Sequence, residues 1–364
     1  MGLRFLSSLF LVGFLSGCGL KLGVQQWDLQ KSSKMLAVTT TNYQSGALAI
    51  LDIENRLARL EFSPIFPDAI VKSFSGLTDI FVINRLGADN IQRIDRATGK
   101  TIQQFSVGQG TNPQDLILVG DNAYVSCLES AELLKVNLEA GSIKSRINLM
   151  SFSDSDGSPE ASWMELHEKE LWVQLQRLDR KNSFSPIGLS QIAIFNTGTD
   201  QVIQVINLKA TNPVTPFKRS AEGQWLVAEA GFVGRLSKLD GGIERIDPFK
   251  KESLGFITTE AQLGGDLVDF ECLNKEECLA IISKPQTELV LFDVKTGAKL
   301  RSLWLSSGYD LRQLVRDPEE GLIYVVDGNP YQPKIRVWDE STLQQRLDLN
   351  WNLELPPYQI TFLK

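Results

Sequence analysis

The sequence predicts an all-β protein, a seven-bladed β-propeller with four-stranded antiparallel blades. The first observation behind this prediction is a strand–turn–strand pattern that recurs from residue 35 onward. The second is its period, because corresponding positions of successive units lie 44 to 54 residues apart. A period of about 40–50 residues with four strands per unit is typical of propeller blades. The third is that the chain begins and ends inside a unit.

The third strand of each unit and the turn after it show the repeat most clearly. Residues 91–100 read IQRIDRATGK, and residues 289–298 read LVLFDVKTGA. We expect Asp95 and Asp293 to accept backbone N–H bonds in the turn, and Gly99 and Gly297 to supply a positive φ. The strands around these turns alternate in polarity and are rich in β-branched residues, which favours antiparallel sheet.

The two ends of the chain predict how the ring closes. Residues 35–62 contain the second, third and fourth strands of a unit, and residues 358–362 (YQITF) provide the missing first strand. Six further units lie between them, so the count is seven blades, with the first blade closed by the C-terminal strand. Such closure removes a free sheet edge.

Two short segments resemble a known repeat. Residues 324–327 (YVVD) and 94–100 (IDRATGK) resemble the YVTN-type β-propeller repeats of exported bacterial proteins, and the likeness extends over residues 35–364. The resemblance implies a seven-bladed fold and no particular activity, because such motifs specify blade geometry rather than chemistry.

The N-terminus predicts export and lipid attachment. Arg4 precedes an apolar stretch over residues 5–14, which is too short for a spanning helix of about 20 residues. Residues 15–18 (LSGC) then resemble the lipobox of bacterial lipoproteins. The resemblance implies a signal peptide over residues 1–17, a lipidated Cys18, a tether over residues 18–34 and a propeller domain over residues 35–364. The alternatives are an ordinary secretory signal and a buried N-terminal helix with a chance cysteine.

This reading places the protein in the bacterial cell envelope, attached by lipid. Gly19 after the anchor implies sorting to the outer membrane in enteric-type bacteria. The net charge of −7 argues against a nucleic-acid partner and against broad docking on anionic lipid. We therefore expect membrane contact through the acyl chains alone.

The remaining cysteines suit an oxidising compartment. Cys272 and Cys278 flank a polar five-residue segment between two apparent strands, so we expect a disulfide across that hairpin. Cys127 lies within a predicted strand and is expected to be a buried thiol.

Catalytic residues are scarce. The single histidine, His167, falls in a predicted solvated turn, and no nucleophile elbow, phosphate loop or dinucleotide fingerprint occurs. We expect no enzymatic activity, cofactor or metal. Residues 154–160 (DSDGSPE) are interpreted as a flexible acidic loop, with a calcium loop as the weaker alternative.

One face of the predicted propeller collects the candidate binding residues. It carries the connections from fourth to first strands and from second to third strands. Acids stand where the first strands begin, with Arg312 and Lys218 able to neutralise part of their charge: Asp68, Asp115, Glu160, Asp266 and Asp310. They either focus negative potential at a channel mouth or, as we favour, cap local turns.

Long second-to-third-strand connections add arginines and aromatic side chains to the same face. They either form a binding patch or pack the loops down, and the sequence does not separate these possibilities. The residues concerned are Arg177, Arg180, Phe184, Phe232, Arg235 and Tyr331.

These observations favour a non-enzymatic binding or scaffold module for a protein, peptide or glycan. One alternative is an envelope propeller enzyme acting on a small molecule, such as a lactonase. Another is a subunit of outer-membrane barrel assembly, although the seven tryptophans follow no docking repeat.

Overall fold

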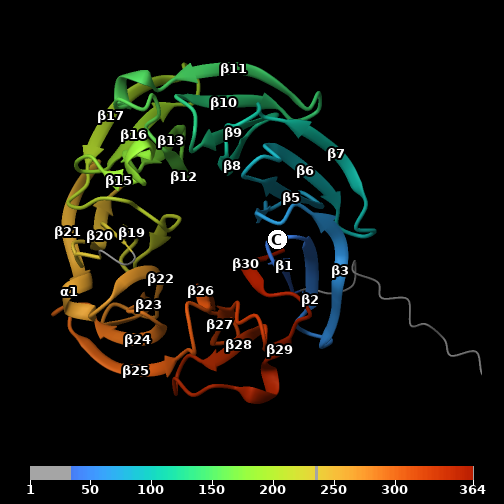
Figure 1. The fold of residues 1–364 in the computed structure, drawn as a ribbon, viewed down its shortest axis with the longest axis vertical. Helices are drawn as coiled ribbons and strands as arrows, with labels where there is room; N and C mark the ends of the chain where they lie inside the picture. Colours follow the sequence, from blue (N-terminus) through green and yellow to red (C-terminus); the bar gives the residue numbers. More distant parts are fainter. Residues whose placement is uncertain (1–33, 234–236, 364) are drawn as a thin grey trace, which may run out of the picture.

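The computed structural model describes residues 34–233 and 237–363 and confirms the predicted fold. Seven four-stranded antiparallel sheets stand around a central channel (Figure 1). We number the blades from the N-terminus and give the strands from the channel outward. Blade 1 contains β30 (Pro357–Phe362), β1 (Met35–Thr41), β2 (Gly46–Asp52) and β3 (Leu57–Ile65).

The next three blades follow in chain order. Blade 2 contains β4 (Ala69–Ser73), β5 (Asp79–Asn84), β6 (Asn90–Asp95) and β7 (Thr101–Ser106). Blade 3 contains β8 (Pro113–Val119), β9 (Asn122–Cys127), β10 (Glu132–Asn137) and β11 (Ser142–Asn148). Blade 4 contains β12 (Ala161–His167), β13 (Glu170–Leu175), β16 (Gln191–Asn196) and β17 (Gln201–Asn207).

Blades 5 to 7 complete the ring. Blade 5 contains β18 (Lys218–Arg219), β19 (Trp225–Glu229), β20 (Gly242–Asp247) and β21 (Glu252–Thr259), and α1 (Glu260–Leu263) follows it. Blade 6 contains β22 (Asp266–Cys272), β23 (Glu277–Ser283), β24 (Thr287–Asp293) and β25 (Lys299–Leu305). Blade 7 contains β26 (Leu311–Asp317), β27 (Leu322–Asp327), β28 (Lys334–Asp339) and β29 (Trp351–Asn352).

The two chain ends close blade 1 as predicted. Strand β30 pairs antiparallel with β1, in a register that runs from Leu36 opposite Phe362 to Thr40 opposite Pro357. Backbone bonds extend the pairing at both ends, because Thr41 N donates to Pro356 O at 2.8 Å and Leu363 N donates to Met35 O at 2.9 Å. The innermost strand of blade 1 therefore comes from the far end of the sequence.

The predicted turns also form. The Asp95 carboxylate accepts the backbone N–H of Thr98 at 2.8 Å, and Gly99 has φ 73°. The Asp293 carboxylate accepts the N–H of Thr296 at 2.7 Å, and Gly297 has φ 74°.

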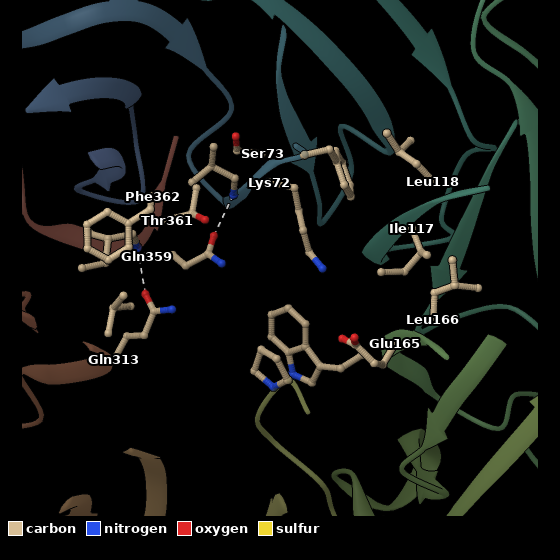
Figure 2. Close-up of a pocket in the computed structure, with 16 residues that line it drawn as sticks. Lys72, Ser73, Ile117, Leu118, Glu165, Leu166, Gln313, Gln359, Thr361 and Phe362 are labelled. Carbon is tan, nitrogen blue, oxygen red and sulfur yellow. Dashed lines mark hydrogen bonds between the residues drawn. The ribbon is translucent and has the colours of Figure 1, made fainter. Parts of the chain in front are cut away.

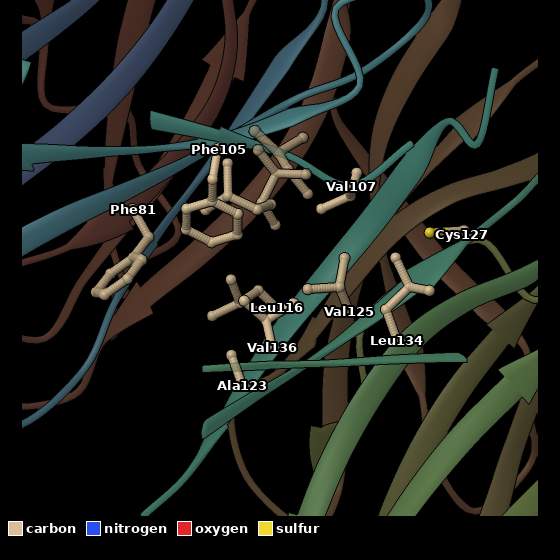
Figure 3. Packing of buried hydrophobic residues seen from close by; sticks show 12 residues of the cluster. Phe81, Phe105, Val107, Leu116, Ala123, Val125, Cys127, Leu134 and Val136 are labelled. Carbon is tan, nitrogen blue, oxygen red and sulfur yellow. The ribbon is translucent and has the colours of Figure 1, made fainter. Parts of the chain in front are cut away.

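Each of the seven blade junctions has its own apolar cluster, because neighbouring blades pack face to face. Strand residues alternate between the two junctions that flank a blade. In β1, Ala37 packs toward blade 2, whereas Leu36 and Val38 pack toward blade 7. Figure 3 shows the junction of blades 2 and 3, where Phe81 and Phe105 face residues of β8, β9 and β10.

Polar side chains join the innermost strands of neighbouring blades. At four junctions, a mid-strand side-chain oxygen accepts a backbone N–H from the next innermost strand, and we call these contacts latches. The four are Gln359 to Val71 (2.7 Å), Asp115 to Met164 (2.8 Å), Asp269 to Leu314 (2.7 Å) and Gln313 to Ile360 (2.8 Å).

A lysine of the preceding blade neutralises each aspartate latch. Lys72 Nζ lies 2.5 Å from an Asp115 oxygen, and Lys218 Nζ lies 2.8 Å from an Asp269 oxygen. Asp115 is fully buried, and burial raises its pKa despite the pairing with Lys72.

The cysteines pair as predicted. Cys272 and Cys278 face each other in the register of β22 and β23, and they form a disulfide. Cys127 is a buried free thiol, and desolvation raises its pKa to about 12.

Candidate binding face and central channel

We call the face with the fourth-to-first and second-to-third connections the upper face, and the opposite one the lower face. Each acid that the sequence places on the upper face has a partner of its own. Asp68 forms an ion pair with Arg85 (Oδ1 to Nη2, 2.5 Å), and Asp310 accepts from Ser307 Oγ at 3.0 Å. Asp266 accepts from Ser237 Oγ, and Asp115 lies inside the ring as a latch.

Glu160, the fifth acid, holds the first long connection of blade 4. Its carboxylate is fully buried and accepts the backbone N–H of Leu178 at 2.7 Å. Desolvation, together with nearby Asp156 and Asp154, raises its pKa to about 8. Each of these acids thus has a partner within the protein, but among the described contacts only Glu160 holds a connection of its own blade through a backbone N–H.

The acidic segment 154–160 contacts the same blade 4 connection. Asp156 accepts the backbone N–H of Ser158 at 2.9 Å and that of Arg180 at 2.8 Å, and it pairs with the Arg180 guanidinium at 3.2 Å. Its carboxylate thus joins the segment to the blade 4 connection. Among the described residues, no three metal-ligating side chains gather into a group that could hold a metal ion.

The long connections present several of the predicted side chains to solvent. The short hairpin of β14 (Leu178–Asp179) and β15 (Ser185–Pro186) encloses the 3-10 turn η2 (Arg180–Asn182). Phe184 is 48 % exposed and Tyr331 is 90 % exposed. Arg177 donates to Leu189 O at 2.9 Å, and Lys238 lies over the ring of Phe232. Arg235 lies outside the described residues.

Exposed apolar side chains are unevenly distributed between the two faces. In the described part of the chain, ten large exposed apolar side chains lie in upper-face connections and three in lower-face connections. The upper ten are Tyr43, Phe66, Leu86, Met150, Phe184, Ile187, Leu189, Val233, Tyr309 and Tyr331, and the lower three are Leu77, Phe249 and Leu347. Large exposed apolar side chains are thus more numerous in the upper-face connections of the described chain than in its lower-face ones.

The central channel contains two chambers that the sequence did not predict, and they share lining residues. The lower chamber, of about 490 Å³, includes Lys72, Glu165, Gln313 and Gln359 in its wall (Figure 2). The upper chamber, of about 200 Å³, shares Gln313, Gln359 and Trp163 with it, and its wall includes Arg85 and Tyr309 from upper-face connections. Its lining comes from six blades, so residues far apart in sequence meet there: Ile70, Arg85, Trp163, Val214, Thr215, Pro216, Val268, Asp269, Tyr309, Arg312, Gln313, Tyr358 and Gln359.

The upper chamber contains two arginines, of which only one has hydrogen-bonding side-chain partners among the described residues. Arg85 pairs with Asp68 and donates to the Tyr358 hydroxyl at 2.7 Å. Arg312 lies over the Tyr358 ring, 5.6 Å from its centroid. It makes no ion pair and no side-chain hydrogen bond with any described residue. The sequence placed Arg312 beside the acids, but the structure places it in the channel. Lys218 likewise pairs with Asp269 in the ring.

His167 is not in a solvated turn. It is the last residue of β12, half-buried, and its ring makes edge contacts with Trp225 at 5.5 Å and Phe249 at 5.3 Å between centroids. Its position is therefore explained by packing on the lower side of blades 4 and 5.

The fold defines a β-propeller protein, and solved structures share it. A putative 6-phosphogluconolactonase from Bacteroides uniformis is 11% identical, with a TM-score of 0.62, over 92% of this chain and 100% of that one. Apo AztD from Citrobacter koseri is 12% identical, with a TM-score of 0.52, over 91% and 98%. The dihydro-heme d1 dehydrogenase NirN is 15% identical, with a TM-score of 0.57, over 91% and 75%.

These likenesses concern the fold alone, because proteins with unrelated activities share it at this level of identity. Comparison with protein-family models found no match, and comparison with curated proteins found no relative. Within the described residues, no helix is both long and apolar enough to span a membrane.

Proposed function

We propose that this chain is a lipoprotein of the bacterial envelope, with YVTN-type repeats, that binds a protein partner through its upper face without catalysing a reaction. The observation that carries the proposal is the gathering of exposed apolar side chains on that face. Tyr331 at 90 % exposure and Phe184 at 48 % are its most prominent aromatic members. Tyrosine, tryptophan and arginine are enriched among the few residues that dominate the binding energy of protein interfaces.

The buried polar groups at the blade 4 connection, which carries Phe184, support the same role. Glu160 and Asp156 hold this connection through backbone N–H bonds, so Phe184 belongs to a segment that is fixed at both Leu178 and Arg180. A preorganised surface loses less conformational entropy on binding than a flexible one.

The place where the chain enters the propeller supports the proposed orientation. Lys34 forms an ion pair with Asp317 at 2.7 Å and lies 3.4 Å from Glu319, both of which belong to the lower face. A lipid on Cys18 would therefore be tethered to the lower face. The upper face would then be directed away from the membrane and open to a partner.

Site-specific crosslinking in cells tests the proposal. A photoreactive amino acid replaces Tyr331 in one variant and Phe249 in a matched control. Phe249 is 77 % exposed but lies on the lower face. We expect one discrete crosslinked protein from position 331 and none of the same mass from position 249. Identical product patterns from both positions would contradict binding by the upper face.

Lipid attachment is tested separately. Radioactive palmitate should label the wild-type protein and leave Cys18→Ser unlabelled, because only the thiol of Cys18 is expected to carry a diacylglycerol. Equal labelling of both proteins would refute the anchor and leave the crosslinking result standing.

A further inference from the structure

The latches determine which atoms face the central channel. The Gln359 Oε1 atom accepts the backbone N–H of Val71, and the Gln313 Oε1 atom accepts that of Ile360. A carboxamide that directs its oxygen to one side directs its NH₂ group to the other. Both NH₂ groups consequently lie on the channel side, as Figure 2 shows, and neither has an acceptor among the described residues.

The charged groups around the upper chamber are paired, with one exception. Asp68 pairs with Arg85, and Lys218 pairs with both Asp269 and Glu271. Arg312 has no carboxylate partner in the described chain, so one positive charge remains beside the two carboxamide donors. The Tyr358 hydroxyl accepts from Arg85, which leaves its own O–H free to donate. The chamber therefore offers an excess of hydrogen-bond donors and one guanidinium without a carboxylate partner.

The Arg312 side chain is held in place. The Tyr358 ring lies on one side of it, and the backbone of Gly328 lies close to its Nε atom. A Cβ atom at residue 328 would lie 2.6 Å from Arg312 Nε and 3.0 Å from Pro357 O. Only glycine leaves room for the arginine in this position.

We propose that the upper chamber binds a small organic carboxylate, with its anionic group on Arg312 and its apolar body against Trp163, Val214 and Val268. A guanidinium presents parallel N–H groups that match the two oxygens of a carboxylate. The chamber volume of about 200 Å³ is below the usual range of roughly 300–1,000 Å³ for drug-sized ligands. The ligand is therefore a small acid, and it enters past Tyr309 from the upper face.

This site is independent of the proposed partner surface, and its test has a separate readout. Isothermal titration of the purified full chain compares benzoate with the neutral isostere benzamide and with inorganic phosphate. We expect benzoate to bind at least about tenfold more tightly than either, because charged hydrogen bonds and the apolar wall both contribute. A pentapeptide with a free C-terminus is compared with the same peptide amidated at its C-terminus. This pair tests whether the chamber takes a peptide carboxylate instead of a free small acid.

Three variants locate the binding. Arg312→Met should weaken benzoate binding by at least about tenfold. Gly328→Ala keeps every charge but displaces the Arg312 guanidinium, so it should also weaken benzoate binding. Gln359→Glu keeps the acceptor for Val71 N–H but turns a carboxylate oxygen toward the chamber, and should abolish binding. Arg56→Met is the matched control, because Arg56 also lies over an aromatic ring, that of Trp351, outside the chamber.

Melting temperatures of all variants separate lost binding from lost folding. The proposal is overturned if benzoate and benzamide bind alike, if phosphate binds as tightly as benzoate, or if folded Arg312→Met binds benzoate as the wild type does. Undetectable benzoate binding by the wild type at millimolar concentration also overturns it. None of these results changes the crosslinking outcome at Tyr331.

Discussion

Blades 5 and 6 are neighbours whose innermost strands are built in opposite ways. Strand β22 of blade 6 has seven residues, contains the Asp269 latch and ends at the Cys272–Cys278 disulfide. Strand β18 of blade 5 has two residues, and Pro213 and Pro216 precede it. Proline lacks a backbone N–H, so this segment has fewer donors to offer a neighbouring latch.

The side chains that contact the blade 5 segment are hydrogen-bond donors, whereas those of the four latches are acceptors. At the four latches an oxygen accepts an N–H of the next blade. Blade 4 instead donates to blade 5, through Gln176 Nε2 to Pro213 O (2.8 Å), Trp163 Nε1 to Val214 O (3.0 Å) and Gln174 Nε2 to Thr215 O (3.1 Å). At these five junctions, therefore, a side chain supplies the acceptor or the donor that the backbone of the next innermost strand lacks. The irregular segment also lines the upper chamber.

Removing the Asp269 carboxylate should have the largest effect on this comparison. Asp269→Ala takes away the acceptor for Leu314 N–H and one of the two carboxylates that pair with Lys218. Breaking a buried ion pair costs about 3–5 kcal/mol. We expect a loss of that size in the free energy of unfolding, measured with urea.

Asp269→Asn is the matched control, because it keeps an acceptor oxygen and removes the charge. It should lose less stability than Asp269→Ala. If both variants unfold at the wild-type urea midpoint, the latch does not hold the ring together.

Glu260 joins blades 5 and 6, and its pKa makes that junction sensitive to pH. The fully buried carboxyl accepts from Gly241 N at 2.9 Å and Leu267 N at 2.7 Å, and desolvation raises its pKa to about 8. The folded state thus binds the proton more tightly than the unfolded chain. The stabilisation is complete below the ordinary glutamate pKa and is lost as the pH rises through about 8.

The wild type should therefore be less stable at pH 8 than at pH 6, by at most about 2–3 kcal/mol per such glutamate. Glu260→Gln should flatten this dependence in part, and the addition of Glu160→Gln should flatten it further. Stability that rises between pH 6 and pH 8 in the wild type, by urea titration, would contradict the sign of both shifts.

The disulfide is the other device that distinguishes blade 6. Replacing Cys272 and Cys278 with serine removes a cross-link that closes a short loop, which is worth about 2 kcal/mol in the chain-entropy description. We expect a loss of that order in the oxidised protein. Reduction of the wild type should reproduce this loss. An unchanged urea midpoint in both experiments would show that the disulfide adds no stability.

Sequence patterns predicted the blades well because they depend on local chemistry. Strand alternation, the Asp95–Gly99 type of turn and the strand at residues 358–362 each identify an element without knowledge of its neighbours. The pairing of Cys272 with Cys278 was predictable for the same reason, since both residues belong to one hairpin.

The channel was not predictable in this way, because its chemistry depends on register across the ring. Gln313 and Gln359 look like ordinary polar positions of alternating strands. Arg312 and Tyr358 are 46 residues apart in sequence and meet only when blade 1 closes. The acids at the strand starts were located correctly in sequence, but a partner such as Arg85 could not be assigned without coordinates.

The donors from blade 4 provide a smaller test of the comparison. Gln174 is fully buried, and its Nε2 atom donates to Thr215 O. Gln174→Met keeps much of the volume but leaves that buried carbonyl without this donor, at a cost of about 1–2 kcal/mol. Gln174→Glu should be worse, because a carboxylate places an oxygen against the carbonyl. If Gln174→Met is as stable as the wild type in urea, complementarity does not govern this junction.

Pro216→Ala should produce the smallest change. The Thr215–Pro216 peptide bond is trans, so an N–H at residue 216 would point away from Thr215 O and from its donor Gln174. The restored N–H therefore cannot form a latch with Gln174. The substitution chiefly gives the unfolded chain more freedom, which destabilises the protein by about 0.4–1 kcal/mol. Thermal unfolding of Pro216→Ala measures this loss of stability, with Pro213→Ala measured in parallel for comparison. A clear gain in stability would contradict this account. It would mean that the backbone N–H absent at Pro216 limits the stability of the junction between blades 4 and 5 more than the side-chain donors of blade 4 support it.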